Sequence, residues 1–465
     1  MPNARLARIT KHTMNKNKIV IAGGGFAGLY AAMYFDKHLA RRPDIGVTLI
    51  SRENFILFTP MLHEVAAGDL SPNDIVNPLR RILRHVNVVE AEVDRIDLSA
   101  RTIHCSAGVK DSTVEFKFDH LLLTIGSETN FFDMPGVRDW AVTMKSLADA
   151  TLLRNRVIAL LEEASLEKHE SRRKELLTFV IAGGGFAGVE TTGAINDFVR
   201  ETVRFYPLLR EEEIRVAVIH AGKFLLPELG EELGRYAEQK LSARKIEIIK
   251  GARVANYDGS TVELSNATRV RATTLVWTAG VKASPVIESL DCGKERGRVL
   301  VNEYLAVPGV NGIWAAGDCA AVPAGKGGEF YPPTAQHGLR EAIVAAKNIE
   351  ATIAGGPLKP FAFKTLGQLA TIGRHAGVAS MFGVKFSGFV AWAMWRTVYL
   401  LKLPRLTKKL RVMMGWTLDL LFGREIEQLI TVRDVQGLVD RLARMRARTD
   451  VHSAEQTSEP VAAAR

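Results

Sequence analysis

The sequence predicts an α/β fold that contains one strand–turn–helix unit twice and ends in amphipathic helices. The eight residues IAGGGFAG at 21–28 recur unchanged at 181–188. Each copy follows an apolar run typical of a buried strand and precedes a run typical of a helix. Near the C-terminus, residues 385–424 combine basic residues with tryptophan and leucine. A chain of 465 residues is long enough for two or three domains with substantial cores.

The glycines of the first copy have the spacing G-x-G-x-x-G. The first allows a tight turn from strand to helix, the second lets the backbone approach a pyrophosphate, and the third lets helix and strand pack closely. The phosphate then lies at the helix N-terminus, where amide groups are unpaired. These glycines are Gly23, Gly25 and Gly28, and the second copy has Gly183, Gly185 and Gly188. Two such motifs in this context predict two Rossmann-like dinucleotide-binding domains, and hence two nucleotides that exchange electrons.

The strand that follows each glycine turn is expected to end in an acidic residue that binds ribose hydroxyls. Neither strand does so here. The first ends at Ser51, followed by Arg52, and the second ends at His220. A serine still hydrogen-bonds a ribose, whereas His220 removes a carboxylate that would repel a 2′-phosphate. The preference between NADH and NADPH therefore stays open at this point.

Three further strand-like runs end in a glycine turn. They are HLLLTIGS with Gly126, TLVWTAGV with Gly280, and NGIWAAGDCA with Asp318. A carboxylate in the last position can accept a hydrogen bond from a polyol. Asp318 could equally cap the N-terminus of a helix, because aspartate is favoured there too.

In this order the motifs resemble the two-dinucleotide-binding flavoprotein disulfide-reductase superfamily, and within it the type II NADH dehydrogenases. The resemblance covers about residues 17–430. It implies a single-subunit, non-proton-pumping NADH:quinone oxidoreductase, with FAD in the first unit and NADH, or NADPH, in the second. The motifs that carry it are IAGGGFAGL, LFTPMLHEVAAG, TIGS, IAGGGFAGVE, LLPELGEELG, WTAGVKASP, WAAGDCA, PPTAQHG and LATIGRHAGVA.

The resemblance also implies the site residues. Glu190 matches a glutamate near the nicotinamide and the flavin, where it positions them or donates a proton; its alternative is a carboxylate favoured by the helix dipole. Gln336 matches a motif at the flavin–quinone junction, and these two are the expected catalytic residues. The expected cofactor-binding residues are Gly23, Gly25, Phe26, Ala27, Gly28, Ser51, Arg52, Gly126, Asp318, Ala335, Gln336, Gly183, Gly185, Gly188, Glu190, His220 and Gly280.

The chain departs from the family motifs near the expected quinone site. Arg340 stands where the motif usually has a second glutamine, and Gly338 where it has an alanine. Leu366 replaces a lysine often found before the glycine of a later motif, with Lys364 two residues away.

The basic C-terminal segment predicts attachment to an anionic membrane surface, which a membrane quinone requires. Residues 385–424 hold eight basic residues and one acid, a net charge of +7. Residues 388–403 are too short, and too interrupted by Arg396, to span a bilayer comfortably, since a span needs about 20 apolar residues. After Pro404, Leu406, Leu410, Met413, Thr417 and Leu421 share one side of a predicted interfacial helix. We expect a peripheral protein on the cytoplasmic face of the inner membrane, and a homodimer contact is the alternative.

Several other classes of function are disfavoured. Three distant cysteines and no CxxC pair argue against a disulfide framework, a zinc or other metal site, and a thiol reductase. The charge pattern, with much apolar bulk between the basic residues, does not predict nucleic-acid binding. Two alternatives stay open: a sulfide:quinone oxidoreductase, which needs a cysteine pair beside the flavin, and a non-enzymatic redox sensor that binds FAD and NADH.

The predicted domain map places the second nucleotide domain inside the first. We expect an FAD-binding domain at 17–150 and 300–380, an NAD(P)H-binding domain at 151–299, and a membrane-association region at 381–430. The tail at 440–465 is small, polar and predicted to be disordered. Residues 1–14 are predicted to be a solvated extension, with a transit peptide as the alternative.

Overall fold

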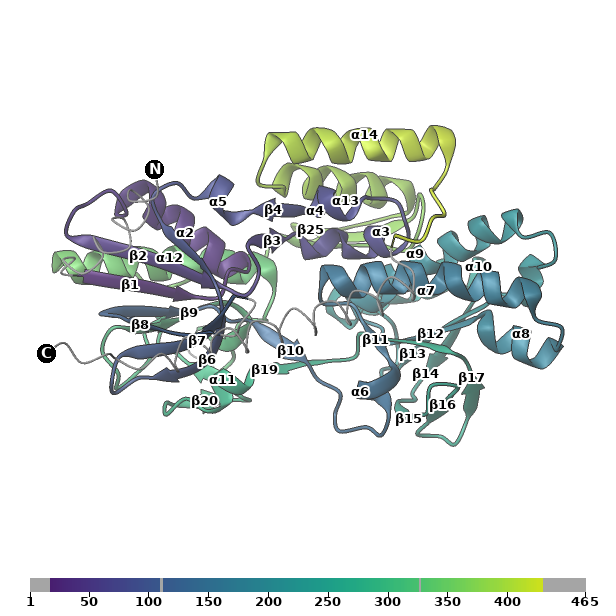
Figure 1. The fold of residues 1–465 in the computed structure, drawn as a ribbon, viewed down its shortest axis with the longest axis horizontal. Helices are drawn as coiled ribbons and strands as arrows, with labels where there is room; N and C mark the ends of the chain where they lie inside the picture. The colour runs from purple at the N-terminus through teal and green to yellow at the C-terminus, as the bar shows by residue number, and fades with distance from the viewer. Residues whose placement is uncertain (1–16, 109–111, 326–327, 430–465) are drawn as a thin grey trace, which may run out of the picture.

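The computed structural model describes residues 17–108, 112–325 and 328–429. The predicted tail at 440–465 and the extension at 1–14 lie outside the described residues. Two parallel sheets lie at opposite ends of the molecule, and two C-terminal helices cover the space above them (Figure 1).

The first sheet is parallel, and its strand order shows that the chain leaves the first unit and returns to it. Its order is β22 (Ile313–Ala315), β9 (His120–Leu123), β1 (Asn17–Ala22), β2 (Ile45–Ser51) and β5 (Asn87–Glu90). Strand β22 lies almost 200 residues after β9 in sequence and still pairs with it in parallel. Helices α2 (Phe26–His38) and α12 (Ala335–Ala354) make extensive contact with each other beside this sheet.

The second sheet repeats this architecture with the intervening segment of the chain. Its order is β11 (Val142–Thr143), β18 (Thr274–Trp277), β12 (Thr178–Ala182), β13 (Arg215–His220) and β14 (Ile246–Lys250). Its main helices are α7 (Leu147–Leu166), α9 (Phe186–Thr202) and α10 (Glu231–Ala243). β12 is buried throughout, and β1 is a buried apolar run from Ile19 to Ala22, as expected for strands of a covered parallel sheet. The predicted fold class, with the second Rossmann-like unit inserted into the first, is confirmed.

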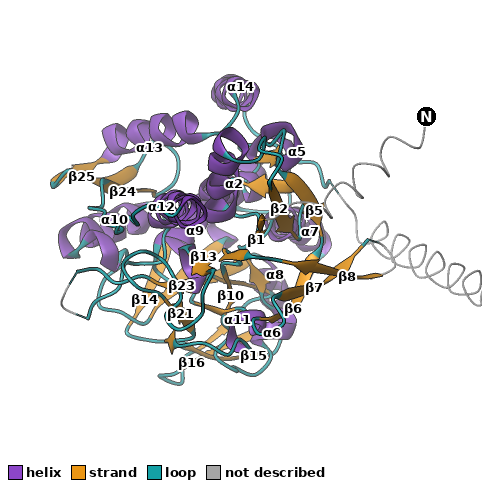
Figure 2. Cartoon of the chain, turned by 90° about the vertical axis from the view of Figure 1, so that its left-hand side faces the viewer, coloured by secondary structure: helices purple, strands orange, loops and turns teal. Residues whose placement is uncertain are grey.

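A third body carries the C-terminal helices. The antiparallel strands β24 (Gly367–Thr371), β25 (Gly377–Met381) and β26 (Val384–Ser387) form a small sheet. Helix α13 (Gly388–Lys402) packs on it, and α14 (Leu406–Phe422) lies outermost (Figure 2). Among the described residues, no helix has both the length and the apolar character that crossing a bilayer requires.

Short elements complete the two nucleotide domains. The antiparallel pair β10 (Ser127–Thr129) and β19 (Val281–Ala283) joins the segments that leave and re-enter the second domain. The other short strands are β3 (Phe55–Leu57), β4 (Val76–Pro78), β6 (Glu92–Asp97), β7 (Thr102–Ala107), β8 (Ser112–Lys117), β15 (Val254–Tyr257), β16 (Thr261–Leu264), β17 (Arg269–Arg271), β20 (Lys294–Glu295), β21 (Arg298–Leu300) and β23 (Ala320–Ala321). The short helices are η2 (Thr59–Met61), α3 (Leu62–Ala66), α4 (Pro72–Ile75), α5 (Leu79–Ile82), α6 (Val137–Trp140), α8 (Glu170–Leu176), η3 (Val203–Phe205), η4 (Glu211–Glu213), η5 (Pro227–Leu229), α11 (Pro285–Glu288) and η6 (Gly317–Cys319).

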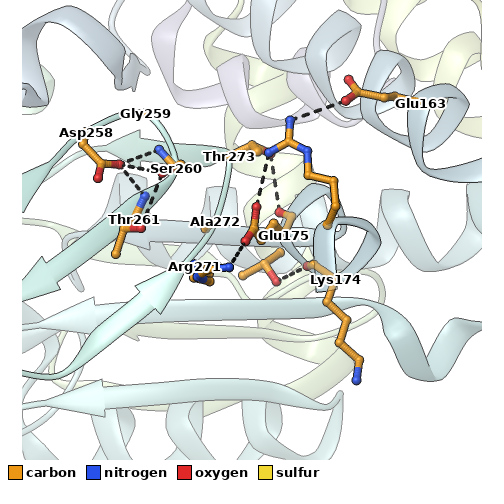
Figure 3. A network of polar contacts seen from close by, with 12 residues as sticks. Glu163, Lys174, Glu175, Asp258, Gly259, Ser260, Thr261, Arg271, Ala272 and Thr273 are labelled. Carbon is orange, nitrogen blue, oxygen red and sulfur yellow. Dashed lines mark hydrogen bonds and ion pairs between the residues drawn. The ribbon is translucent and has the colours of Figure 1, made fainter. Parts of the chain in front are cut away.

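Ion pairs hold α8 against α7 and β17 at the outer end of the second domain (Figure 3). Arg172 lies 3.2 Å from Glu175 and 3.5 Å from Glu163. Glu175 also pairs with Arg271 at 2.6 Å. These pairs tie neighbouring surface elements together, and we assign them a structural role.

Candidate functional site

The first glycine turn has the geometry of a phosphate cradle. Gly23 has φ +111°, and a Cβ there would lie 2.3 Å from the carbonyl oxygen of Thr124. A Cβ on Gly28 would lie 1.8 Å from the carbonyl oxygen of Gly23, whereas the space beside Gly25 is open. No side chain caps the N-terminus of α2, and its first turn contains no acidic residue. Unpaired amide groups therefore meet open space where the backbone approaches closely, which fits a bound pyrophosphate.

The residues around this turn close its base. Ser51 is buried at the end of β2 and lies directly against Gly24. Arg52 is exposed and pairs with Glu53 at 3.8 Å and Glu92 at 4.0 Å. Ser51 is therefore part of the cradle wall, whereas Arg52 lies at the rim.

Helix α12 approaches the first turn through small residues. A Cβ on Gly338 would lie 3.1 Å from the Cα of Gly317, and 3.8 Å from the Cβ of Ala27. The glycine that replaces the family alanine at 338 thus lets α12 approach η6 without displacing it. Phe26, beside Ala27, packs against Phe58 with ring centroids 5.8 Å apart.

Asp318 lies within the short turn η6 and is oriented by a chain of hydrogen bonds. Ser127 donates from Oγ to Asp318 Oδ2 at 2.9 Å, and Lys145 Nζ donates to the same Oγ at 2.9 Å. Burial lowers the pKa of Lys145. The N-cap of η6 is Ala316, so the alternative that Asp318 caps a helix is wrong. Gly126, with φ +80°, lies one residue before Ser127.

The second glycine turn matches the first. Gly183 has φ +119°, and a Cβ on Gly188 would lie 1.8 Å from its carbonyl oxygen. Helix α9 begins without a side-chain cap at Gly185 and has no acid in its first turn. One acidic group does approach: Glu228 Oε1 lies 3.7 Å from the Cβ position of Gly185. Near the end of the same sheet, the Phe132 ring covers Gly280.

His220 ends β13 with one ring nitrogen engaged and one free. The amide of Gly184 donates to His220 Nδ1 at 3.2 Å, so the proton of the neutral ring resides on Nε2. That Nε2 is buried and has no hydrogen-bond partner among the described residues. Burial lowers the pKa of His220, which keeps the ring neutral at pH 7. A donor therefore stands where the family has an acceptor.

Glu190 lies in a buried site between the two domains and the C-terminal helices. Its Oε1 accepts hydrogen bonds from the amide of Thr371 at 3.3 Å and from Trp395 Nε1 at 3.0 Å. Its Oε2 lies 3.8 Å from His63 Nδ1. Burial raises the pKa of Glu190 to about 8. Glu190 lies beyond the first turn of α9, so the alternative that it serves the helix dipole is wrong.

Gln336 and Arg340 occupy the start of α12, one turn apart. Gln336 Nε2 donates to the carbonyl oxygen of Gly367 at 3.3 Å. Arg340 Nη1 donates to the carbonyl oxygen of Gln336 at 2.7 Å, and its guanidinium lies 4.2 Å from the Phe363 ring centroid. Ala335 is exposed at the first position of the uncapped helix. A cation therefore replaces the amide of the family motif.

A second buried acid near Glu190 was not predicted from the sequence. Glu64 accepts a hydrogen bond from Trp416 Nε1 at 3.1 Å and lies 3.9 Å from Arg396. Burial raises its pKa to about 8. The Arg396 guanidinium lies between the rings of Trp392 and Trp416, at 4.3 and 4.5 Å from their centroids. The acid within the apolar run MLHEVAAG, and the arginine within the apolar run of α13, were the available signals.

Helix α14 turns an apolar face away from the protein. Trp416 and Val412 are buried on its inner face. Its outer face exposes Leu406, Leu410, Met413, Met414, Leu418, Leu421 and Phe422. The predicted apolar side is therefore the solvent-facing one.

Five of the eight basic residues of this segment are engaged within the protein. The contacts are Lys385 with Glu232, Arg396 with Glu64, Lys408 with the carbonyl oxygen of Asn73, Lys409 with the carbonyl oxygen of Leu401, and Arg424 with Asp69. Among the described residues, Lys402, Arg405, Lys409 and Arg411 form no ion pair with an acidic side chain. The net charge of +7 therefore overstates what the surface presents.

Two glycine cradles on two parallel sheets, with an aspartate after a third strand, define a flavin- and pyridine-nucleotide-dependent oxidoreductase. The family model of pyridine nucleotide-disulphide oxidoreductases matches residues 17–347, and the NDH2 C-terminal domain model matches residues 366–425. The type II NADH:quinone oxidoreductase Ndh of Mycobacterium tuberculosis is 33% identical over 91% of this chain and 92% of its own length. A probable NADH dehydrogenase of Dictyostelium discoideum is 32% identical over 89% and 91%.

The fold also matches solved structures. NDH2 from Plasmodium falciparum in complex with NADH superposes with a TM-score of 0.82 at 22% identity, over 89% of this chain and 100% of that one. The sulfide:quinone oxidoreductase of Aquifex aeolicus gives a lower TM-score of 0.65 at 17% identity, over 88% and 96%.

This chain belongs to the type II NADH:quinone oxidoreductases. It is an enzyme that uses FAD to pass electrons from NADH to a quinone. The comparisons favour this function over the sulfide-oxidising and sensor alternatives.

Proposed function

We propose that the first glycine turn, with Ser51 and Asp318, holds FAD, and that the second, with His220, holds NADH. The support is that both helices begin uncapped at a glycine that leaves room for a phosphate. When bound, the flavin accepts a hydride from NADH and passes two electrons to the quinone. The protein binds both partners, orients them and supplies the proton that the quinone needs.

Glu190 is the group that holds this proton. Both hydrogen-bond donors that reach its carboxyl approach Oε1, which leaves Oε2 to carry the proton. With a pKa of about 8, the carboxyl is protonated at pH 7. A general acid works best when its pKa lies near the working pH. The buried carboxyl, with both donors on Oε1 and Oε2 left free for a proton, is the observation that carries the assignment. Gln336 and Arg340 lie on the side where the quinone would accept electrons.

The test is Glu190→Gln, followed through the two half-reactions in FAD-loaded protein under anaerobic conditions. Bleaching of the flavin absorbance by NADH needs no proton from the protein and is expected to change little. Recovery of the absorbance on adding a short-chain quinone is expected to slow by about 100-fold, the scale of general acid catalysis. Equal recovery rates in the variant and the natural chain would remove Glu190 from the reaction.

The membrane face belongs to the same proposal. The exposed apolar side of α14 enters the interface of the inner membrane on its cytoplasmic side, where NADH is available. Lys402, Arg405, Lys409 and Arg411 flank it and attract anionic lipid, at about 1 kcal/mol each. A homodimer through the same face is the alternative occupant.

A further inference from the structure

A small polar cavity lies between α3, α9 and α13, beside Glu190. Its volume is about 20 Å³, and its lining includes His63, Glu64, Asp197, Thr371, Arg374 and Arg396. A site of this volume holds one water molecule when two to four polar groups surround it. Arg396 Nε is buried and has no protein partner among the described residues, as expected of a group that a buried water satisfies.

The inner end of the cavity reaches Glu190 through His63. His63 Nδ1 lies 3.8 Å from Glu190 Oε2, and its Nε2 lies 3.2 Å from Thr371 Oγ1. Burial lowers the pKa of His63 to about 4, so the ring is neutral at pH 7. A neutral imidazole accepts a proton on one nitrogen and releases one from the other, so it can pass a proton between the cavity and Glu190.

The outer end reaches partly exposed groups. Arg374 and Asp197 line the cavity, and the amide of Arg374 donates to Asp197 at 2.6 Å. The Arg374 and Asp197 side chains are 26% and 15% exposed, whereas those of His63 and Glu64 are only 7% exposed. Glu64 is a buried carboxyl on the cavity wall between these ends, and it lies 3.9 Å from Arg396.

The established reaction requires such a connection. NADH, quinone and one proton give NAD⁺ and quinol, since the hydride supplies two electrons and one proton and solution supplies the second proton. Glu190 is buried, so a proton that it gives up must be replaced through the protein.

We propose that the cavity, with Glu64 and His63 on its walls, carries protons from the surface at Asp197 and Arg374 to Glu190. Glu64 takes a proton from the cavity water and returns one to it. His63 passes this proton to Glu190, which is thereby protonated again after each quinone is reduced. Glu64 and His63 act through Glu190 and are positioning residues. The inference rests on the assignment of Glu190 as the proton donor.

The charged groups that face this route come from every element packed around it. They are His63 and Glu64 on α3, Asp69 after it, Glu190, Asp197 and Glu201 on α9, Arg244 after α10, Arg374 after β24, Arg396 on α13, Asp419 on α14 and Arg424 after it. Arg424 pairs with Asp69 at 2.8 Å and with Glu201 at 3.3 Å, and Arg244 pairs with Asp197 at 2.7 Å. Burial raises the pKa of the three remaining carboxyls, those of Glu64, Glu190 and Asp419, and of these three Glu64 lines the cavity.

Two variants of the FAD-loaded full chain test the route. Glu64→Gln removes its titrating group, and Ala194→Val fills the cavity with two methyl groups without changing any charge, because Ala194 lines it. In both, we expect NADH to bleach the flavin at the natural rate. Recovery with quinone is expected to slow by about tenfold at pH 8, less than the roughly 100-fold loss of the proton donor itself, because protons still reach Glu190 by slower routes. The slowing should shrink toward pH 5.5, where free protons are more abundant.

A second readout needs no turnover. The infrared band of the protonated carboxyls shifts when the protein is moved into D₂O. The rate of this shift reports how fast exchange with solvent reaches the carboxyls. Ala194→Val should slow this shift at least tenfold. Glu213→Gln is the matched control, because Glu213 is a buried carboxylate that pairs with Arg173 at 2.7 Å, away from the cavity. It should leave recovery and exchange unchanged.

The outcomes separate this inference from the proposed function. If Glu190→Gln slows recovery while Glu64→Gln and Ala194→Val do not, the route is wrong and the role of Glu190 stands. A slowing that is equal at every pH would also overturn the route, since it would indicate a structural effect. If Glu190→Gln has no effect, both assignments fall.

Discussion

At the residue scale, we propose that His220 governs how the ribose of the second nucleotide is recognised. Its neutral Nε2–H can donate to a ribose hydroxyl or a 2′-phosphate, whereas a carboxylate would accept from ribose and repel the phosphate. Lys250 lies opposite it in the β13–β14 register, where it pairs with Glu238 at 2.7 Å. Because no carboxylate replaces His220 at the end of β13, we expect little discrimination against NADPH.

The variant His220→Glu should therefore sharpen the preference for NADH. We expect the ratio of kcat/KM for NADH over NADPH to rise by about tenfold or more, since one unpaired charge contact is worth 1–3 kcal/mol. His220→Gln, which adds no charge, is the control. Steady-state oxidation of both nucleotides measures the ratio, and a ratio that stays the same in His220→Glu would place ribose recognition elsewhere.

Glu64 links the site to stability. Its pKa is about 8 in the folded protein against 4.5 as the ordinary value, so folding favours the protonated form. This contribution is fully present below pH 4.5 and is lost as pH rises toward 8. One such group makes the free energy of unfolding fall by up to about 1.4 kcal/mol per pH unit within that window.

Glu64→Gln should flatten this slope. Urea unfolding between pH 5.5 and 8 gives the free energy of unfolding at each pH. The free energy of unfolding of the variant, relative to that of the natural chain, is expected to be highest at pH 8. The control Glu213→Gln removes a carboxylate whose pKa is lowered by the groups around it, so it should keep the slope. Parallel curves for Glu64→Gln and the natural chain would contradict the raised pKa.

At the scale of elements, the C-terminal helices have two faces with different tasks. Trp395 and Trp416 donate to the buried acids Glu190 and Glu64, so α13 and α14 are fastened to the catalytic domains by hydrogen bonds as well as by packing. The outer face of α14 is exposed, and we propose that it binds lipid. Deleting the helices would therefore damage the site as well as the proposed membrane contact.

A point variant separates these tasks. Leu410→Glu places a charge in the middle of the exposed face of α14, and we expect it to weaken flotation with anionic vesicles by about tenfold, because it removes apolar burial and repels the lipid. Leu208→Glu, at an exposed leucine outside the C-terminal helices, is the control. If Leu410→Glu floats like the natural chain but no longer sediments as a dimer, the face binds a second copy and not lipid.

At the scale of the whole molecule, the features that a short stretch of sequence determines could be predicted, and these are the glycine turns and the strands beside them. The tight turn and the close packing of helix and strand require glycine at Gly23, Gly28 and their counterparts, so the spacing of these glycines is visible in the sequence. Asp318 likewise follows shortly after its strand. The nucleotide domains could therefore be predicted from the sequence.

The buried acids could not be found in the same way. Glu64 meets Trp416 across 352 residues, and Glu190 meets Trp395 across 205, so no local pattern announces either pair. The charge count of the C-terminal segment overstated the positive charge on the surface for the same reason. Lys408 and Arg424 bind groups within the protein that are distant in sequence.

The central claim is that electrons from NADH reach a quinone through one flavin held by this chain. An anaerobic spectrum of the purified, FAD-loaded protein tests it most directly. The account predicts that the yellow absorbance bleaches on adding NADH and returns on adding one equivalent of quinone. A colourless protein that refuses added FAD, or a bleached flavin that no quinone restores, would contradict it.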